Sequence, residues 1–236
     1  MDDNIDPDLN YHLYANNEEN CNYYALDQYQ NTLNPDATLN IINYNIRSFN
    51  RNFDAFASAF LVNGAPDVLC LTETWFSSDN TIDLPGFHGF HITRDRRSRS
   101  VSLYIKNQYD ATCVDELSYS NPTREVCTVD VKVNNFNGTF IAIYRPHSDT
   151  VSNLCDELAT LLENIILRNK CIVIMGDLNI CLLKNESPII DYCNFLHSNH
   201  FIPVIDKPTH SSQIDGVAPT LLDHTCINKF ILIPVG

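Results

Sequence analysis

Four short apolar runs along the chain each lead to a polar residue that could bind a metal ion or a phosphate. Because the runs are rich in β-branched and other apolar residues, they predict strands that are buried on both faces. The polar residues stand at the C-terminal ends of these strands, which is where α/β sheets place their chemistry. The predicted strands are Leu39–Asn45, Asp67–Glu73, Thr139–Tyr144 and Cys171–Met175, the last followed directly by Gly176-Asp177-Leu178-Asn179.

The remaining pattern supplies helices and antiparallel strands. Apolar residues at helical spacing predict three helices, near Phe53–Leu61, Leu154–Ile166 and Pro188–Ser198, with Ser152 as the N-cap of the second. Alternating residues predict antiparallel strands at Val101–Ile105, Ala111–Leu117 and Val126–Val133. Mixed strands with helices between them predict an α/β fold of two mixed β-sheets packed face to face, with the helices outside.

Residues 1–37 have a different composition from the rest of the chain. They contain eight acidic residues and no Lys or Arg, and they show neither helical nor strand periodicity. This composition predicts a disordered acidic leader, followed by one domain over residues 38–236. Without the leader, the formal net charge falls from −14 to −6, since 21 acidic residues then face 15 basic ones.

An acidic protein repels polyanions, so a nucleic-acid-binding face would have to be local. The one basic cluster is Arg94, Arg96, Arg97 and Arg99, which fits either such a face or a solvated turn. No apolar run is long enough to span a membrane. The nine cysteines include no Cys-x-x-Cys pair, which predicts a reducing intracellular compartment, nuclear or cytoplasmic.

Asp177 and Asn179 are two residues apart, directly after a buried strand. If the strand continues that far, its period of two points both side chains the same way. A carboxylate beside an amide can hold a water, a metal ion or a phosphate oxygen. An Asx turn that only closes the strand would use the same residue types, so this motif alone leaves both interpretations open.

Five motifs favour the ligand-binding interpretation over the Asx turn, because together and in this order they resemble the endonuclease/exonuclease/phosphatase superfamily. They are Asn45-Ile46-Arg47-Ser48, Leu71-Thr72-Glu73-Thr74-Trp75, Ile143-Tyr144-Arg145-Pro146, Gly176-Asp177-Leu178-Asn179 and Leu222-Asp223-His224. The chain looks closest to the apurinic-endonuclease-like domain of non-LTR (LINE-type) retrotransposons. The resemblance implies a four-layer αββα sandwich and covers roughly residues 38–229.

The resemblance also implies a role for each residue at a strand end. Glu73 would bind Mg²⁺ (or Mn²⁺), which prefers hard carboxylate oxygens, and Asn45 would support the ion or its water. Asp177 would position or activate the attacking water, and Asn179 would hold that water or a phosphate oxygen. Tyr144 would bond the phosphate.

Duplex DNA is the implied partner, with Arg145, Thr209 and His210 assigned to substrate binding. Trp75 is interpreted as a packing residue at the edge of the domain. Before Val101, relatives carry a glycine run where this chain has Arg97-Ser98-Arg99-Ser100. If the backbone there needs positive φ, each non-glycine residue costs about 1 kcal/mol or more.

Relatives have two Asp-His dipeptides, and Asp223-His224 matches the first of them, so both residues are assigned to the catalytic set. In relatives, the first Asp orients the second His, which lies on a final strand. This chain ends at Gly236 without that second dipeptide. His224 cannot simply replace the second His, because neighbours on a strand face opposite sides. We therefore expect a domain that lacks its last strand and has weak or no activity, with a rate loss on the order of 10²–10⁴.

The resulting hypothesis is a metal-dependent phosphodiester hydrolase, by resemblance a retrotransposon-type DNA endonuclease that nicks target DNA. Two alternatives stay open. One is a non-catalytic retrotransposon remnant or an exapted binding protein. The other is a small-molecule phosphoesterase of the same fold, which would need a shaped pocket near Arg145 and His147.

Overall fold

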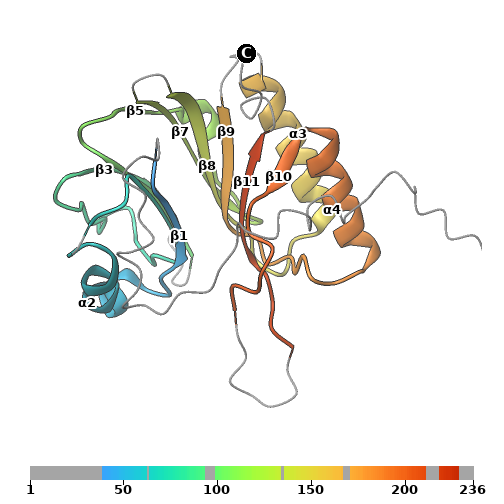
Figure 1. Ribbon diagram of the computed structural model, residues 1–236, viewed down its shortest axis with the longest axis horizontal. Helices are drawn as coiled ribbons and strands as arrows, with labels where there is room; N and C mark the ends of the chain where they lie inside the picture. The colour runs from blue at the N-terminus through green and yellow to red at the C-terminus, as the bar shows by residue number, and fades with distance from the viewer. Residues whose placement is uncertain are drawn as a thin grey trace, which may run out of the picture.

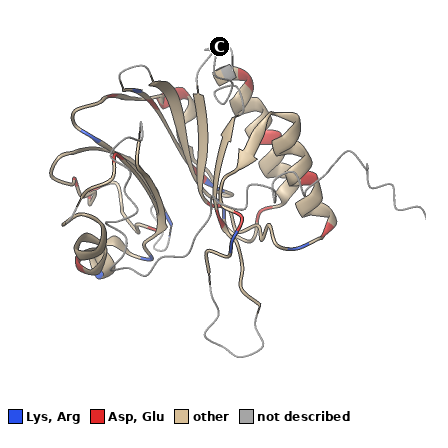
Figure 2. Cartoon of the chain, in the orientation of Figure 1, with Lys and Arg blue, Asp and Glu red and all other residues tan. Residues whose placement is uncertain are grey.

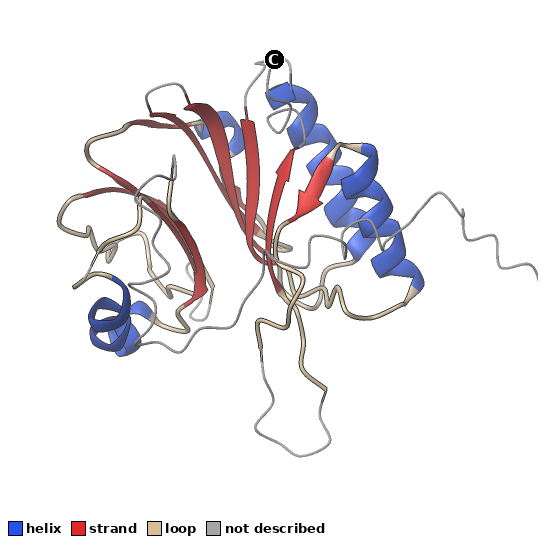
Figure 3. Cartoon of the chain, in the orientation of Figure 1, coloured by secondary structure: helices blue, strands red, loops and turns tan. Residues whose placement is uncertain are grey.

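Two β-sheets lie face to face, and helices cover their outer faces (Figure 1, Figure 3). The computed structural model describes residues 39–62, 64–93, 99–133, 136–166, 171–210 and 218–228, so the predicted leader lies outside the described residues. The arrangement is the four-layer α/β sandwich that the sequence predicts. No helix in the described part of the chain is long and apolar enough to cross a membrane.

The first sheet has four strands in the order β1-β2-β4-β3. Its parallel pair, β1 and β2, is joined by helix α2, and the other neighbours are antiparallel. The bounds are β1 Ile41–Asn45, α2 Phe49–Phe60, β2 Val68–Thr72, β3 Phe87–Ile92 and β4 Val101–Lys106.

The second sheet has the strand order β10-β11-β9-β8-β7-β5, and β6 also pairs with β7. Here the parallel pair is β8 and β9, which is joined by helix α3. The bounds are β5 Asp110–Cys113, η2 Asp115–Leu117, β6 Tyr119–Ser120, β7 Glu125–Val133, β8 Phe136–Tyr144, α3 Val151–Ile166, β9 Cys171–Asp177, α4 Ser187–Ser198, β10 Phe201–Pro203 and β11 Asp223–Asn228.

Three apolar clusters separate the four layers. On β2, Cys70 packs between the sheets while its neighbour Leu69 packs under α2. On β9, Val173 likewise packs between the sheets and Ile174 packs under α3 and α4. Successive strand residues point to opposite faces, so both faces of these strands are buried, as their continuous apolar runs predict.

Some predicted elements differ from those observed. The predicted strand 111–117 is wrong in its second half, because β5 ends at Cys113 and a 3₁₀ turn follows. Strand β3 was not predicted. Ser152 is not the N-cap of α3, since the helix begins at Val151 and the Thr150 hydroxyl accepts a hydrogen bond from the Asn153 N–H at 3.2 Å.

The topology brings five strand ends to one edge of the sandwich. β1 and β2 are parallel, as are β8 and β9, so each pair ends together. β11 is antiparallel to β9 and therefore begins where β9 ends. Asp177 at the end of β9 stands opposite Tyr144 on one side and Asp223 on the other. This edge lies at the bottom of Figure 1, where β11 starts.

Candidate active site

An amide side chain connects acidic residues from the two sheets. The Nδ2 atom of Asn45, at the end of β1, donates to Glu73 Oε1 at 3.0 Å and to Asp177 Oδ2 at 2.9 Å. Glu73 follows β2 in the first sheet, whereas Asp177 ends β9 in the second. The structure therefore brings together three of the predicted site residues, which are separated by up to 132 positions in the chain.

The carboxyl group of Asp177 lies in an unusual electrostatic environment. Asp177 is only 4 % exposed. Burial and, in addition, the nearby charge of Asp223 raise the pKa of its carboxyl group to about 7. Hydrogen bonds from the Asn45 amide and from the Asn179 N–H lower the pKa of Asp177, but by less. A carboxyl group with a pKa near neutrality is suited to accept a proton from water.

Asp223 lies beside Asp177, as the strand register requires. Burial also raises the pKa of Asp223. Its Oδ1 atom is buried and has no hydrogen-bond partner among the residues that the structure describes. The carboxyl groups of Asp177 and Asp223 are thus held side by side at the same edge of the sheet. Two neighbouring acids attract a cation or a hydrogen-bond donor.

Tyr144 and Asn179 complete the group of residues around Asp177. Burial, together with the charges of Glu73 and Asp177, raises the pKa of the Tyr144 phenol to about 12, so the hydroxyl stays protonated at neutral pH. The Asn179 amide donates to the backbone oxygen of Arg145 at 2.6 Å, and this bond fixes its orientation. The backbone of Asn179 has a positive φ of 51°.

Thr209 and His210 lie beside Asp223, on the segment that leads into β11. The Thr209 hydroxyl oxygen accepts hydrogen bonds from the backbone N–H groups of Leu222 and Asp223, each at 3.3 Å. The His210 ring is 3.4 Å from the guanidinium of Arg47. Thr209 and His210 are both exposed, so these two predicted substrate contacts are at the surface next to the acidic group.

Arg145 is not placed as its substrate-binding assignment expects. Its side chain is buried and turned inward, where it donates to the backbone oxygens of Leu178 at 2.7 Å and of Asn179 at 3.3 Å. A second nitrogen donates to the backbone oxygen of Asp149, whose carboxylate also pairs with the buried Arg124. Arg145 therefore holds the loop that carries Asn179 and does not face the substrate side.

His224 does not join the site either. It is on the opposite face of β11 from Asp223, fully buried against α4, with its ring nitrogens near the Tyr192 hydroxyl at 3.3 Å and the Ile180 oxygen at 2.8 Å. Burial lowers the pKa of His224 to about 4, so it is neutral at physiological pH. Its catalytic assignment is corrected to a packing role.

Ser100 lies where relatives carry the glycine run. Its φ is 103°, so the backbone there does adopt a conformation that favours glycine. The Ser100 hydroxyl is buried and compensates with two hydrogen bonds, one with the Thr74 hydroxyl at 2.6 Å and one from the Phe76 N–H at 3.1 Å. These bonds fix the segment that follows Glu73.

Two residues near the site were missed by the sequence analysis. Asn43 donates from its amide to the backbone oxygen of His224 at 2.8 Å, which ties β1 to β11 across the sandwich. Glu125 is fully buried opposite Tyr144, and its charge contributes to the raised pKa of that phenol. An acid at the start of the apolar run Val126–Val133 was the signal that could have identified Glu125.

The carboxylates of this site fit a divalent cation that keeps most of its waters. Glu73 and Asp177, which are joined through Asn45, supply hard oxygen donors, and Mg²⁺ commonly takes only one or two carboxylates. Asn45 offers its N–H groups to these carboxylates, while its Oδ1 accepts from the Arg47 N–H at 3.1 Å. Within the described residues, no three His, Cys, Asp or Glu side chains form a complete metal cage.

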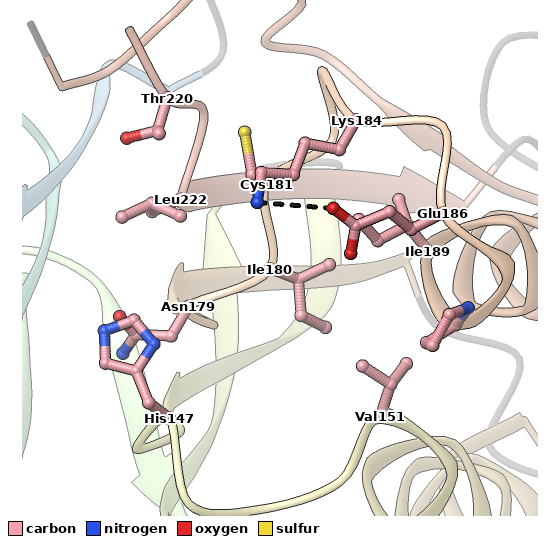
Figure 4. A pocket seen from close by; sticks show the side chains of 11 residues that line it. His147, Val151, Asn179, Ile180, Cys181, Lys184, Glu186, Ile189, Thr220 and Leu222 are labelled. Atoms are coloured by element: carbon pink, nitrogen blue, oxygen red, sulfur yellow. Dashed lines mark ion pairs between the residues drawn. The ribbon is translucent and has the colours of Figure 1, made fainter. Parts of the chain in front are cut away.

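A cavity of about 410 Å³ opens beside Asn179 (Figure 4). His147 stands next to Asn179 at one side of it, and the ion pair of Lys184 with Glu186, 3.3 Å apart, lies on another. Apolar side chains such as that of Ile180 form much of its wall. His147 is thus at a pocket, as the small-molecule alternative requires, but Arg145 does not line it.

The chain belongs to the endonuclease/exonuclease/phosphatase family, whose model matches residues 42–226. No curated protein sequence matches the chain.

Solved structures share the fold at low identity. The endonuclease domain of TRAS1, a telomere-specific non-LTR retrotransposon, matches with a TM-score of 0.57 at 12 % identity, over 80 % of this chain and 84 % of that one. An AP endonuclease from Archaeoglobus fulgidus matches with 0.57 at 15 %, over 80 % and 86 %. The 3′ phosphatase NExo from Neisseria, bound to a product DNA hairpin, matches with 0.58 at 13 %, over 81 % and 87 %.

Proposed function

We propose that this protein hydrolyses phosphodiester bonds in DNA with the help of a divalent cation, in the manner of a retrotransposon-type endonuclease that nicks a duplex. The observation that carries the proposal is the joining of Glu73 and Asp177, from two different sheets, by the single amide of Asn45. The likeness to TRAS1 endonuclease and to NExo with its DNA product supports the choice of DNA.

Each residue of the site has a chemical task in this proposal. Asp177, with its pKa of about 7, takes the proton of the attacking water. The Tyr144 hydroxyl stays protonated and donates a hydrogen bond to a phosphoryl oxygen, and Asn179 orients the water or the phosphate. A cation held by Glu73 and a second carboxylate would, when bound, stabilise the charge that develops on the phosphoryl and leaving oxygens.

A small phosphate ester is the second candidate substrate, because the cavity beside Asn179 and His147 could enclose one. The two candidates differ in what surrounds the scissile phosphate. A duplex needs an open, cationic rim, whereas a small ester needs an enclosing wall.

The test is the nicking of supercoiled plasmid in Mg²⁺, run beside hydrolysis of a chromogenic small phosphodiester. Asp177→Asn and Glu73→Gln should each lower the nicking rate by about 10²–10⁴-fold. Asp110→Asn is the matched control, because this acid in β5 is exposed and its ion pair is with the equally exposed Lys132, at 4.0 Å.

The outcomes separate the candidates. Nicking that depends on both acids supports the endonuclease. Turnover of the small ester without nicking selects the phosphoesterase, and Mg²⁺ binding without any turnover selects the non-catalytic binding protein. Nicking that survives both substitutions would show that this group of residues is not the active site.

A further inference from the structure

Trp75 is the only tryptophan of the chain, and it lies two residues after Glu73. It exposes 40 % of its surface, whereas its neighbours Thr74 and Phe76 are buried, at 1 % and 3 %. Trp75 is thus partly packed against the domain and partly accessible to solvent. Single exposed apolar residues are common on protein surfaces, so exposure alone assigns no role.

The backbone gives a second, independent observation. Trp75 has a φ of 60° and Glu73 a φ of 52°, which is a left-handed conformation that is unfavourable for bulky side chains. Hydrogen bonds hold this conformation in place. The Trp75 N–H donates to the Arg99 oxygen at 3.1 Å, and the Thr74 N–H donates to the Ser100 oxygen at 3.4 Å. A strained conformation that is held by its surroundings is typical of a functional segment.

A cationic side chain, that of Arg99, lies near both this segment and the site. The backbone oxygen of Arg99 accepts the hydrogen bond from the Trp75 N–H. The Arg99 guanidinium donates to the backbone oxygen of Pro122, just before β7, at 3.3 Å. Its charge reaches Tyr144, on the neighbouring strand β8. Arginine stays charged and favours phosphate, so Arg99 supplies a phosphate-binding group close to both Tyr144 and Trp75.

The opposite layer of the molecule is unsuited to a polyanion. Helices α3 and α4 contain Asp and Glu but no Lys or Arg, as Figure 2 shows. A nucleic acid that approaches the site would therefore be repelled from the helical layer and would extend toward the side of the first sheet, where Trp75 and Arg99 lie.

We propose that Trp75 is a nucleobase-binding platform, which stacks on a base next to the scissile phosphate, and that Arg99 contacts the intervening phosphate. This inference rests on the proposed function, since it places the base on the substrate strand of that site. It makes the substrate a polymer with bases, because a small phosphate ester would not reach Trp75.

The intrinsic fluorescence of the chain tests the proposal directly, because Trp75 is its only tryptophan. Oligonucleotide duplex is added in Mg²⁺ to the full chain carrying Asp177→Asn, so that the DNA stays intact, and binding is followed separately by the anisotropy of a labelled strand. Stacking quenches tryptophan emission and shields the ring from acrylamide. We expect quenching by the duplex and none by an equally long deoxyribose-phosphate polymer without bases.

Variants of Trp75 supply the affinity readout. Trp75→Gly relieves the backbone strain and removes the ring, and we expect it to weaken duplex binding about 5- to 150-fold. Trp75→Phe should restore part of the affinity, because its ring still stacks. Val62→Ala, at an exposed apolar residue after α2, should leave the affinity unchanged.

Each outcome decides the proposal. A duplex that binds by anisotropy without changing the fluorescence of Trp75, or an unchanged affinity in Trp75→Gly, overturns the platform and leaves the proposed endonuclease intact. A chain that binds no duplex at all overturns both.

Discussion

Asp177 shows how a single residue can connect the site to the stability of the fold. Its pKa is about 7 in the folded chain and returns to an ordinary value near 4 when the chain unfolds. Between these two values the folded state holds a proton that the unfolded state has lost. In the absence of a metal ion, the folded state therefore loses stability as pH rises from about 4 to 7.

We predict that thermal unfolding in a chelator shows this loss, with a slope of at most about 1.4 kcal/mol per pH unit from Asp177. Asp177→Asn should unfold at a higher temperature than the wild type at pH 8, and its stability should depend less on pH. Some dependence should remain because the pKa of Asp223 is raised too. Added Mg²⁺ should stabilise the wild type at pH 8. Equal slopes in wild type and variant would refute the raised pKa.

At the scale of elements, the end of β9 depends on one glycine. Gly176 has a φ of 133°, and a Cβ atom there would lie 2.0 Å from the backbone oxygen of Ile143 on the parallel strand β8. β8 and β9 can keep their register up to Tyr144 and Asp177 only because this position has no side chain. The glycine thus permits the close approach that places Asp177 in the site.

We predict that Gly176→Ala lowers the free energy of unfolding by about 3 kcal/mol or more, because the strands must separate. Gly86→Ala is the matched control. Gly86 also has a positive φ, of 86°, but nothing lies within 4 Å of its Cβ position. It should cost only about 1–2 kcal/mol, from the backbone conformation alone. Urea unfolding of both variants measures the difference, and equal losses would show that the contact with Ile143 is relieved cheaply.

At the scale of the whole molecule, charge decides how a polyanion meets the site. Residues 1–37 contribute −8 of the formal net charge of −14. Long-range repulsion slows the association of like-charged molecules and is screened by salt. If the proposed function is correct, the charge of residues 1–37 should therefore slow association with DNA at low salt.

Deleting residues 1–37 should speed association with duplex DNA at low salt and have little effect at high salt, as measured by stopped-flow anisotropy. The melting temperature should stay nearly the same, because the leader has no apolar periodicity from which to build a core. A fall of more than about 4 °C, which for a domain of this size means at least ~1 kcal/mol, would show that the leader stabilises the domain.

The four strands that end at the site could be predicted from the sequence alone, and so could the chemical character of their last residues. Apolar runs that lead to Asn45, Glu73, Tyr144 and Asp177 are local patterns, and the burial of a strand on both faces can be read from them directly. The ordered motifs added the family and the sandwich, and both are confirmed. Parallel pairing aligns the strand ends within each sheet, but the meeting of Asn45 with Asp177 required the packing of one sheet on the other.

The directions of several polar side chains, and the groups that surround them, depend on contacts between segments far apart in the chain. Arg145 follows Tyr144 directly, yet its side chain turns inward because the backbone oxygens of Asp149 and Leu178 accept its hydrogen bonds there. Trp75 is exposed because hydrogen bonds from a distant segment hold its backbone in a left-handed conformation. The raised pKa of Asp177 comes mainly from its burial and in addition from Asp223, which lies on an antiparallel strand 46 positions later. Such properties depend on neighbours from remote parts of the chain, and no local pattern records them.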